Sequence, residues 1–118
     1  ILVDFHAEAT SEKLGMGYFL DGKVSLVFGT HTHVQTADEK ILPGGTGYIT
    51  DIGMCGPSHS VLGVTPELAI RRMRTHLPTR FENASGPCSL SGIVADIDLA
   101  TGKTTSIQRI FAVSSKEA

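Results

Sequence analysis

Several features that would place this chain in a familiar class are scarce or missing from its sequence. It has no tryptophan, aromatic residues make up 6% of it, and its two cysteines, Cys55 and Cys88, form no Cys-x-x-Cys motif. No run approaches the roughly 18 apolar residues that a membrane helix needs. The formal charge of −2 at pH 7 gives no reason to expect bulk attraction to nucleic acid or to anionic membranes. The cysteines favour two thiols in a cytoplasmic protein, with one disulfide as the alternative.

What is present is typical of one globular domain. The chain has 118 residues, of which 41% are hydrophobic and 19% are charged. It opens with Ile-Leu-Val followed at once by Asp4, which is neither an initiator methionine nor a signal peptide. We therefore expect a fragment, or a mature chain cut from something longer.

Periodicity and turn residues predict an α/β fold with two main helices. The first helix contains Gly15 and Gly17, which suggest close packing against a sheet. In the second helix, Thr65 is the expected N-cap and Pro66 the first residue. We expect strands over 1–9, 24–29 and 46–52 and a long loop over 34–45. The first helix should have Ser11 or Thr10 as its N-cap and end at about Leu20, with Gly22 just beyond its end. A second helix over 65–77, a hairpin of 92–99 and 104–113, and a frayed tail at 114–118 complete the prediction.

The first strand and the second helix each have two distinct faces. Residues Leu2, Asp4, His6 and Glu8 alternate onto one face of the first strand, which is unusually polar for so apolar a segment. The second helix has an apolar and a solvated side. Its apolar side consists of Leu68, Ile70, Met73 and Leu77, and its solvated side of Arg71, Arg72 and Arg74.

Histidines carry the strongest chemical signal in the sequence. His31 and His33 follow Gly29 at the end of an apolar run, and His6 lies 25 residues before His31 in an acidic strand. Histidines one residue apart on an extended backbone point to the same side, with Cα atoms roughly 6.6 Å apart. That spacing suits two metal ions about 3.5–4 Å apart. The pattern predicts metal ligation by the three imidazoles, with Asp4 or Glu8 orienting the rings.

The number of metal ions stays open at this point. Three histidines could complete a catalytic zinc site with water as the fourth ligand. A two-metal site needs carboxylates as well, and none of Asp38, Glu39 or Asp51 has a spacing that compels its inclusion. Imidazole with carboxylate suits Mn, Fe or Zn. The Gly-Gly-Thr-Gly sequence at 44–47 lacks the Lys-Ser/Thr of a P-loop, and no serine lies in a Gly-x-Ser-x-Gly elbow.

The histidine motif and its surroundings resemble one family closely. The Gly-Thr-His-Thr-His sequence is similar to the final Gly-His-x-His motif of calcineurin-like metallophosphoesterases, with Thr30 inserted. The wider similarity is to the bacterial YmdB-type phosphoesterases and covers nearly the whole chain. It is carried by residues 4–13 (DFHAEATSEK), 29–38 (GTHTHVQTAD), 41–46 (ILPGGT), 50–54 (TDIGM) and the hairpin at 96–103.

The resemblance implies a four-layer α/β/β/α sandwich with mixed sheets and a dinuclear metal site at the strand ends. It implies a phosphodiesterase that hydrolyses small phosphodiesters such as 2′,3′-cyclic nucleotides with two divalent metal ions. Within this chain it implies that His6 and His31 bind the second metal and that His33 binds the first.

Members of that family are considerably longer than this chain. Their remaining ligands and their general-acid histidine belong to the N-terminal half. The resemblance therefore implies that residues 1–118 are the C-terminal half of a single domain and supply no catalytic acid. Such a half would expose an apolar sheet face or an unpaired edge, so we expect a homo-oligomer.

Three other functions stay open. A capsule-synthesis-type protein on the same scaffold would carry a similar late histidine motif. A non-catalytic metal-binding module would bind metal without phosphodiester turnover. A structural or interaction domain with incidental histidines would show no stabilisation by metal.

Overall fold

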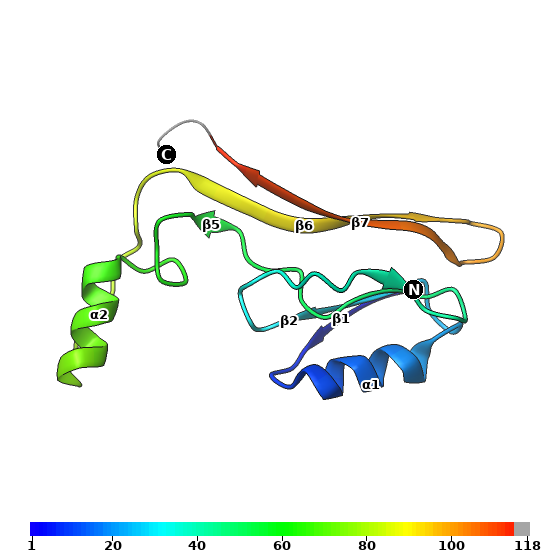
Figure 1. Ribbon diagram of the computed structural model, residues 1–118, viewed down its shortest axis with the longest axis horizontal. Helices are drawn as coiled ribbons and strands as arrows, with labels where there is room; N and C mark the ends of the chain where they lie inside the picture. The colour runs from blue at the N-terminus through cyan, green and yellow to red at the C-terminus, as the bar shows by residue number, and fades with distance from the viewer. Residues whose placement is uncertain (115–118) are drawn as a thin grey trace. The chain divides into compact units, whose positions relative to one another are not determined.

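The computed structural model describes residues 1–114 as a mixed α/β chain with two sheets (Figure 1). The chain divides into two compact units. Unit 1 comprises residues 1–54 and 91–110, and unit 2 comprises residues 55–90 and the chain from Phe111 onward. Most of the expected tail, residues 115–118, lies outside the described residues. Within residues 1–114, no helix has both the length and the apolar character that a membrane span requires.

Unit 1 is built on a four-stranded sheet in the order β1-β2-β4-β3. Strands β1, β2 and β4 run parallel, and β3 pairs with β4 in the antiparallel direction, so the sheet is mixed as expected. Figure 1 shows α1 along one face of this sheet and, along the other, the part of the β6–β7 hairpin that belongs to unit 1, residues 91–110. The elements of unit 1 are β1 (Leu2–His6), α1 (Thr10–Leu20), β2 (Leu26–Thr30), β3 (Lys40–Ile41) and β4 (Gly47–Ile49). Most of β6 (Cys88–Ile97) and of β7 (Thr104–Val113) also belongs to unit 1.

The core of unit 1 lies between α1 and the sheet. Val27, Leu42 and Tyr48 form its buried cluster. Gly17 of α1 faces the ring of Tyr48 so closely that a Cβ atom there would come within 2.6 Å of a ring carbon. The expected close packing of the helix is confirmed at Gly17, whereas Gly15 faces open space. Val3, Leu14, Leu20 and Val24 pack around the cluster.

Several local predictions for unit 1 need correction. The N-cap of α1 is Ala9, with no side-chain capping bond, because Thr10 already lies in the helix. The predicted strand 46–52 is reduced to β4, because a bend at Thr50 interrupts the strand, although the Ile52 N–H still donates to the Gly29 carbonyl of β2 at 3.0 Å. The two residues of β3 lie in what the sequence predicts to be a loop. The predicted end of α1 is confirmed, with Gly22 at a φ of 76°.

Unit 2 contains α2 (Pro66–Thr75) and β5 (Gly56–Pro57), which pairs with the start of β6. Thr65 and Pro66 begin the helix as predicted, but His76 ends it two residues early in a left-handed conformation. The predicted apolar side is buried only in part, because Ala69 is buried and Leu68 is half-buried. Ile70, Met73 and Leu77 are at least half exposed, whereas Arg71, Arg72 and Arg74 are exposed as expected.

Candidate functional site

The parallel strands of unit 1 end at one edge of the sheet. His6 is the last residue of β1, His31 directly follows β2, and Asp51 follows β4 by two residues. The carboxyl ends of parallel strands are where open α/β sheets place their sites. Gly29 allows this convergence, because a Cβ atom there would overlap the carbonyl oxygen of Thr50.

His6 and His31 face each other across this edge. The His6 Nε2 and His31 Nδ1 atoms are 3.2 Å apart, and the rings meet edge to face with centroids separated by 5.0 Å. The Thr30 hydroxyl donates to Asp4 Oδ1 at 3.1 Å, so its oxygen accepts the Nδ1 proton of His6, also at 3.1 Å. The hydrogen bonds from His6 through Thr30 to Asp4 fix the tautomer of His6. They leave its Nε2 atom with a lone pair directed toward His31.

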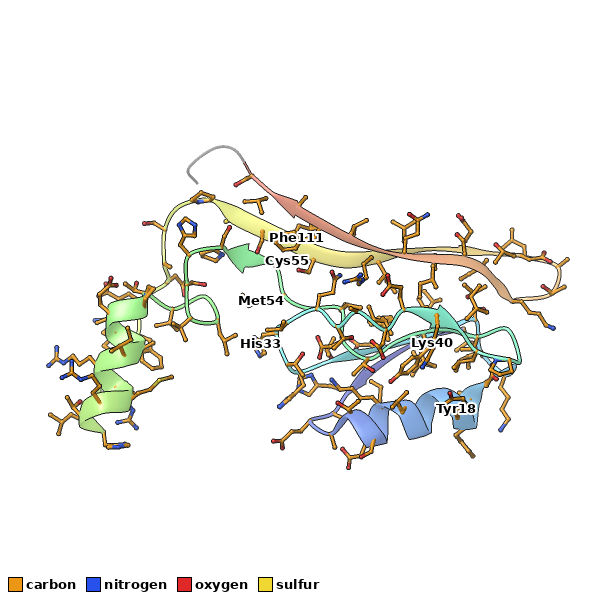
Figure 2. The ribbon with its side chains drawn as sticks, viewed as in Figure 1. Tyr18, His33, Lys40, Met54, Cys55 and Phe111 are labelled. Carbon is orange, nitrogen blue, oxygen red and sulfur yellow. The ribbon has the colours of Figure 1, made fainter. Side chains whose placement is uncertain are left out.

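His33 shares a cavity with the other two histidines. An open cavity of about 210 Å³ is lined by His6, Thr30, His31, His33, Gly53 and Met54. Figure 2 shows His33 and Met54 at the same end of unit 1. The backbone φ angles of His31 and His33 are 121° and 62°, a region that residues other than glycine rarely adopt. Each such residue costs about 1–3 kcal/mol, so the surrounding contacts must hold this loop in place.

Asp51 supplies several of those contacts. Its Oδ2 accepts hydrogen bonds from Lys13 Nζ and from the backbone N–H of Thr32, both at 2.9 Å. Its Oδ1 accepts from the N–H of Gly53 at 2.9 Å. Burial alone would raise the pKa of Asp51, but the hydrogen bonds from Thr32, Lys13 and Gly53 outweigh it and lower that pKa below 3.8. Asp51 is therefore an anion that organises the loop between the histidines.

The facing imidazoles fit two ligands of one metal ion. Ligand nitrogens on a tetrahedral zinc, at about 2.05 Å from the ion, lie about 3.3 Å apart. The 3.2 Å separation of the His6 and His31 nitrogens matches this value. In residues 1–114, no three His, Cys, Asp or Glu side chains are grouped so as to hold an ion by themselves. This part of the chain thus holds two imidazoles at a spacing suited to one ion, with His33 at the same cavity, and does not form a closed site.

The candidate residues of the sequence fall into two groups. His6, His31 and His33 meet at one cavity, and Asp4 reaches His6 through Thr30. Glu8 is exposed and has no hydrogen bond to the described site residues. Two nearby carboxylates are engaged elsewhere: Asp38 accepts from Thr50, and Glu39 pairs with Arg109 at 2.8 Å.

Sequence reasoning missed Thr30 and Lys13. Thr30 stands in the sequence as an insertion in the histidine motif, yet its hydroxyl links Asp4 to His6. Lys13 is as buried as the core, with 1% of its surface exposed. One available signal was its position four residues before Gly17, which places both on the sheet-facing side of α1.

Comparison with known proteins identifies the family of this chain. The family profile described as YmdB-like protein matches residues 1–110. The chain belongs to this family. It is 58% identical over 111 residues to a protein of Bacillus subtilis (strain 168) named 2′,3′-cyclic-nucleotide 2′-phosphodiesterase, covering 94% of the chain and 42% of the relative. It is 44% identical over 113 residues to a Mycoplasma pneumoniae protein named putative phosphatase/phosphodiesterase, covering 95% of the chain and 40% of the relative.

Two solved structures share the fold of this YmdB-like chain. A structure described as a novel phosphatase from Mycoplasma pneumoniae has a TM-score of 0.87 and 45% identity, over 94% of this chain and 40% of that one. A hypothetical protein from Thermus thermophilus has a TM-score of 0.87 and 40% identity, over 95% of this chain and 44% of that one. These matches confirm the predicted α/β phosphoesterase fold and the predicted family. The chain spans about two fifths of the length of the curated relatives it matches.

Proposed function

We propose that the full-length protein containing this chain is a metal-dependent phosphodiesterase, and that residues 1–118 are the C-terminal half of its single phosphoesterase domain. Small phosphodiesters such as 2′,3′-cyclic nucleotides are the proposed substrates. The observation that carries the proposal is the convergence of His6, His31 and His33 on one strand-end cavity. It is supported by membership of a family in which a 58% identical relative is named as such a phosphodiesterase.

In this proposal the three histidines bind metal and do not react with substrate. His6 offers Nε2 because Thr30 and Asp4 occupy its other nitrogen, so Asp4 takes the orienting role that the sequence left open between Asp4 and Glu8. Two divalent cations of Mn, Fe or Zn would supply Lewis acidity at the phosphoryl oxygens and acidify a water. The further ligands and the general acid would come from outside residues 1–118, since the described residues form no closed ligand set.

Location and assembly extend the proposal. Cys55 and Cys88 are both thiols, which agrees with a reducing, cytoplasmic environment. Strand β1 is an edge of its sheet within the described residues, which agrees with pairing to further strands or to a second copy.

The test is phosphodiesterase activity of the full-length protein. Hydrolysis of bis-p-nitrophenyl phosphate and of 2′,3′-cyclic AMP is measured after chelation and again after Mn²⁺ is added back. We compare the wild type with the double variant His31→Ala/His33→Ala. The matched control is His59→Ala, because His59 is an exposed histidine of unit 2 outside the cavity.

We expect Mn²⁺-dependent turnover in the wild type and in the control, and a loss of about 100-fold or more in the double variant. Thermal stabilisation by Mn²⁺ without turnover would instead identify a metal-binding module. A wild type that neither binds metal nor turns over substrate would refute the enzyme assignment.

A further inference from the structure

Unit 1 contains a buried ion pair next to the candidate metal site. Lys13 Nζ on α1 lies 2.9 Å from Asp51 Oδ2, and each side chain has 1% of its surface exposed. Removing two charges from water is costly, and a well-packed apolar pair often stabilises a fold as well or better. Fold stability alone is therefore a weak explanation for an ion pair at this position.

The backbone partners of Asp51 indicate a more specific role. One oxygen of Asp51 accepts the N–H of Thr32, which lies between His31 and His33. The other oxygen accepts the N–H of Gly53, which lines the same cavity. A single carboxylate thus ties the histidine loop to Gly53, another residue that lines the cavity.

The histidine loop needs such a tie because its backbone adopts φ angles that residues other than glycine rarely adopt. His31 and His33 both have positive φ angles, and neither is a glycine. A segment held in this region persists when its surroundings determine it. Asp51 also fixes the following chain, because its N–H donates to Thr36 Oγ1 at 2.9 Å and its carbonyl oxygen accepts the N–H of Thr36 at 3.0 Å.

Lys13 keeps this carboxylate charged and in place. It reaches Asp51 from α1, a different element from the two loops that Asp51 joins. The Lys13 side chain also passes Gly29, where a Cβ atom would lie 2.8 Å from Lys13 Cδ. The glycine before the histidine motif thereby leaves room for the lysine.

We propose that Asp51, held by Lys13, is a positioning residue that sets the geometry of the histidine loop for metal binding. This inference rests on the proposed metal-dependent function. It assigns no contact with metal or substrate to either residue.

The experiment uses the full-length protein and two readouts. Hydrogen exchange of the peptide covering residues 30–36 is measured in metal-free protein, and Mn²⁺ affinity is measured by titration of free Mn²⁺. The variants are Asp51→Asn, Lys13→Met and the double variant that combines them. The control is Asp21→Asn, because Asp21 likewise holds a loop through the backbone N–H groups of Gly44 and Thr46, outside the cavity.

We expect faster exchange of the 30–36 peptide and about 10- to 100-fold weaker Mn²⁺ binding in Asp51→Asn, the range typical of groups that orient ligands. Lys13→Met should shift both readouts in the same direction, whereas Asp21→Asn should leave both unchanged. In the double variant, thermal stability should recover relative to Lys13→Met, because no buried charge is left unpaired. Its Mn²⁺ affinity should stay low, because the carboxylate is still missing.

Two results would overturn the inference. Folded Asp51→Asn protein with wild-type Mn²⁺ affinity would show that the ion pair serves the fold alone. If the Mn²⁺ affinity of the double variant recovers together with its thermal stability, the ion pair likewise serves the fold alone. A wild type that binds no Mn²⁺ would refute the proposed function itself. The hydrogen exchange of residues 30–36, compared between Asp51→Asn and the wild type, would still test separately whether Asp51 holds the loop.

Discussion

Asp38 is a second carboxylate that the fold keeps ionised. It accepts a hydrogen bond from the Thr36 hydroxyl at 2.6 Å and from the backbone N–H of Thr50 at 3.1 Å, and it also accepts from the Thr50 hydroxyl. Burial would raise the pKa of Asp38, but the hydrogen bonds from Thr36 and Thr50 outweigh it and bring that pKa below 3.8. The charged form is thus the one that the folded state prefers.

The free energy of unfolding should therefore depend on pH through Asp38. A carboxyl whose pKa is lower in the folded state stabilises fully above its unfolded pKa, near 3.8, and loses this contribution as pH falls through the folded pKa. Asp38→Asn should cost about 1–2 kcal/mol at pH 7. In urea unfolding between pH 7 and pH 2.5, the gap between wild type and variant should shrink below pH 4. A gap that stays constant would contradict this role for Asp38.

At the scale of elements, α1 offers a matched pair of glycines. Gly17 lies against the buried ring of Tyr48, where an added Cβ would come within 2.6 Å of a ring carbon. Gly15 is two residues away on the same helix and has nothing within 4 Å of such a Cβ. The same substitution to alanine therefore tests packing at one position and helix propensity at the other.

We expect opposite signs for the two substitutions. Gly15→Ala should raise the free energy of unfolding by about 0.5–1 kcal/mol, because alanine favours the helix and restricts the unfolded chain. Gly17→Ala should lower it by about 1–2 kcal/mol, since overlap with Tyr48 outweighs the same gain. Chemical denaturation of both variants measures the difference, and stabilisation by Gly17→Ala would show that α1 can move away from the sheet.

The elements also show which information lies in local sequence. The alternation in β1 placed Asp4 and His6 on one face, and the structure exposes both while half-burying Val3 and Phe5. Local pattern could not place β3, whose two residues are a strand because β4 lies beside them. It also misjudged α2, where Ile70 and Met73 follow a helical period yet stay exposed in unit 2.

The residues of the candidate site likewise divide into those that local sequence reveals and those that it does not. The histidines could be found because they cluster in sequence and follow strands. The Lys13–Asp51 pair joins residues 38 apart, and the Thr30 link depends on the register that pairs it with His6. Contacts of this kind depend on tertiary structure, which a single sequence does not encode in any short pattern.

For the molecule as a whole, the sheet of unit 1 has an edge at β1. Strand β1 pairs with β2 on one side, and the described residues place no strand on its other side. Ile1 and Leu2, at the start of this strand, are more than half exposed. A strand edge beside exposed apolar side chains is a template for pairing with another chain.

We therefore expect residues 1–118, expressed alone, to associate with themselves more strongly than the full-length protein does. In the full-length protein, the proposed remainder of the domain would cover this edge. Light scattering coupled to gel filtration, over a concentration series of both forms, measures the difference. A charge introduced by Leu2→Lys should weaken association of the isolated chain, because edge lysines oppose strand pairing. An isolated chain that remains a monomer at high concentration would contradict the half-domain proposal, because an uncovered β1 edge with apolar neighbours would then need no partner.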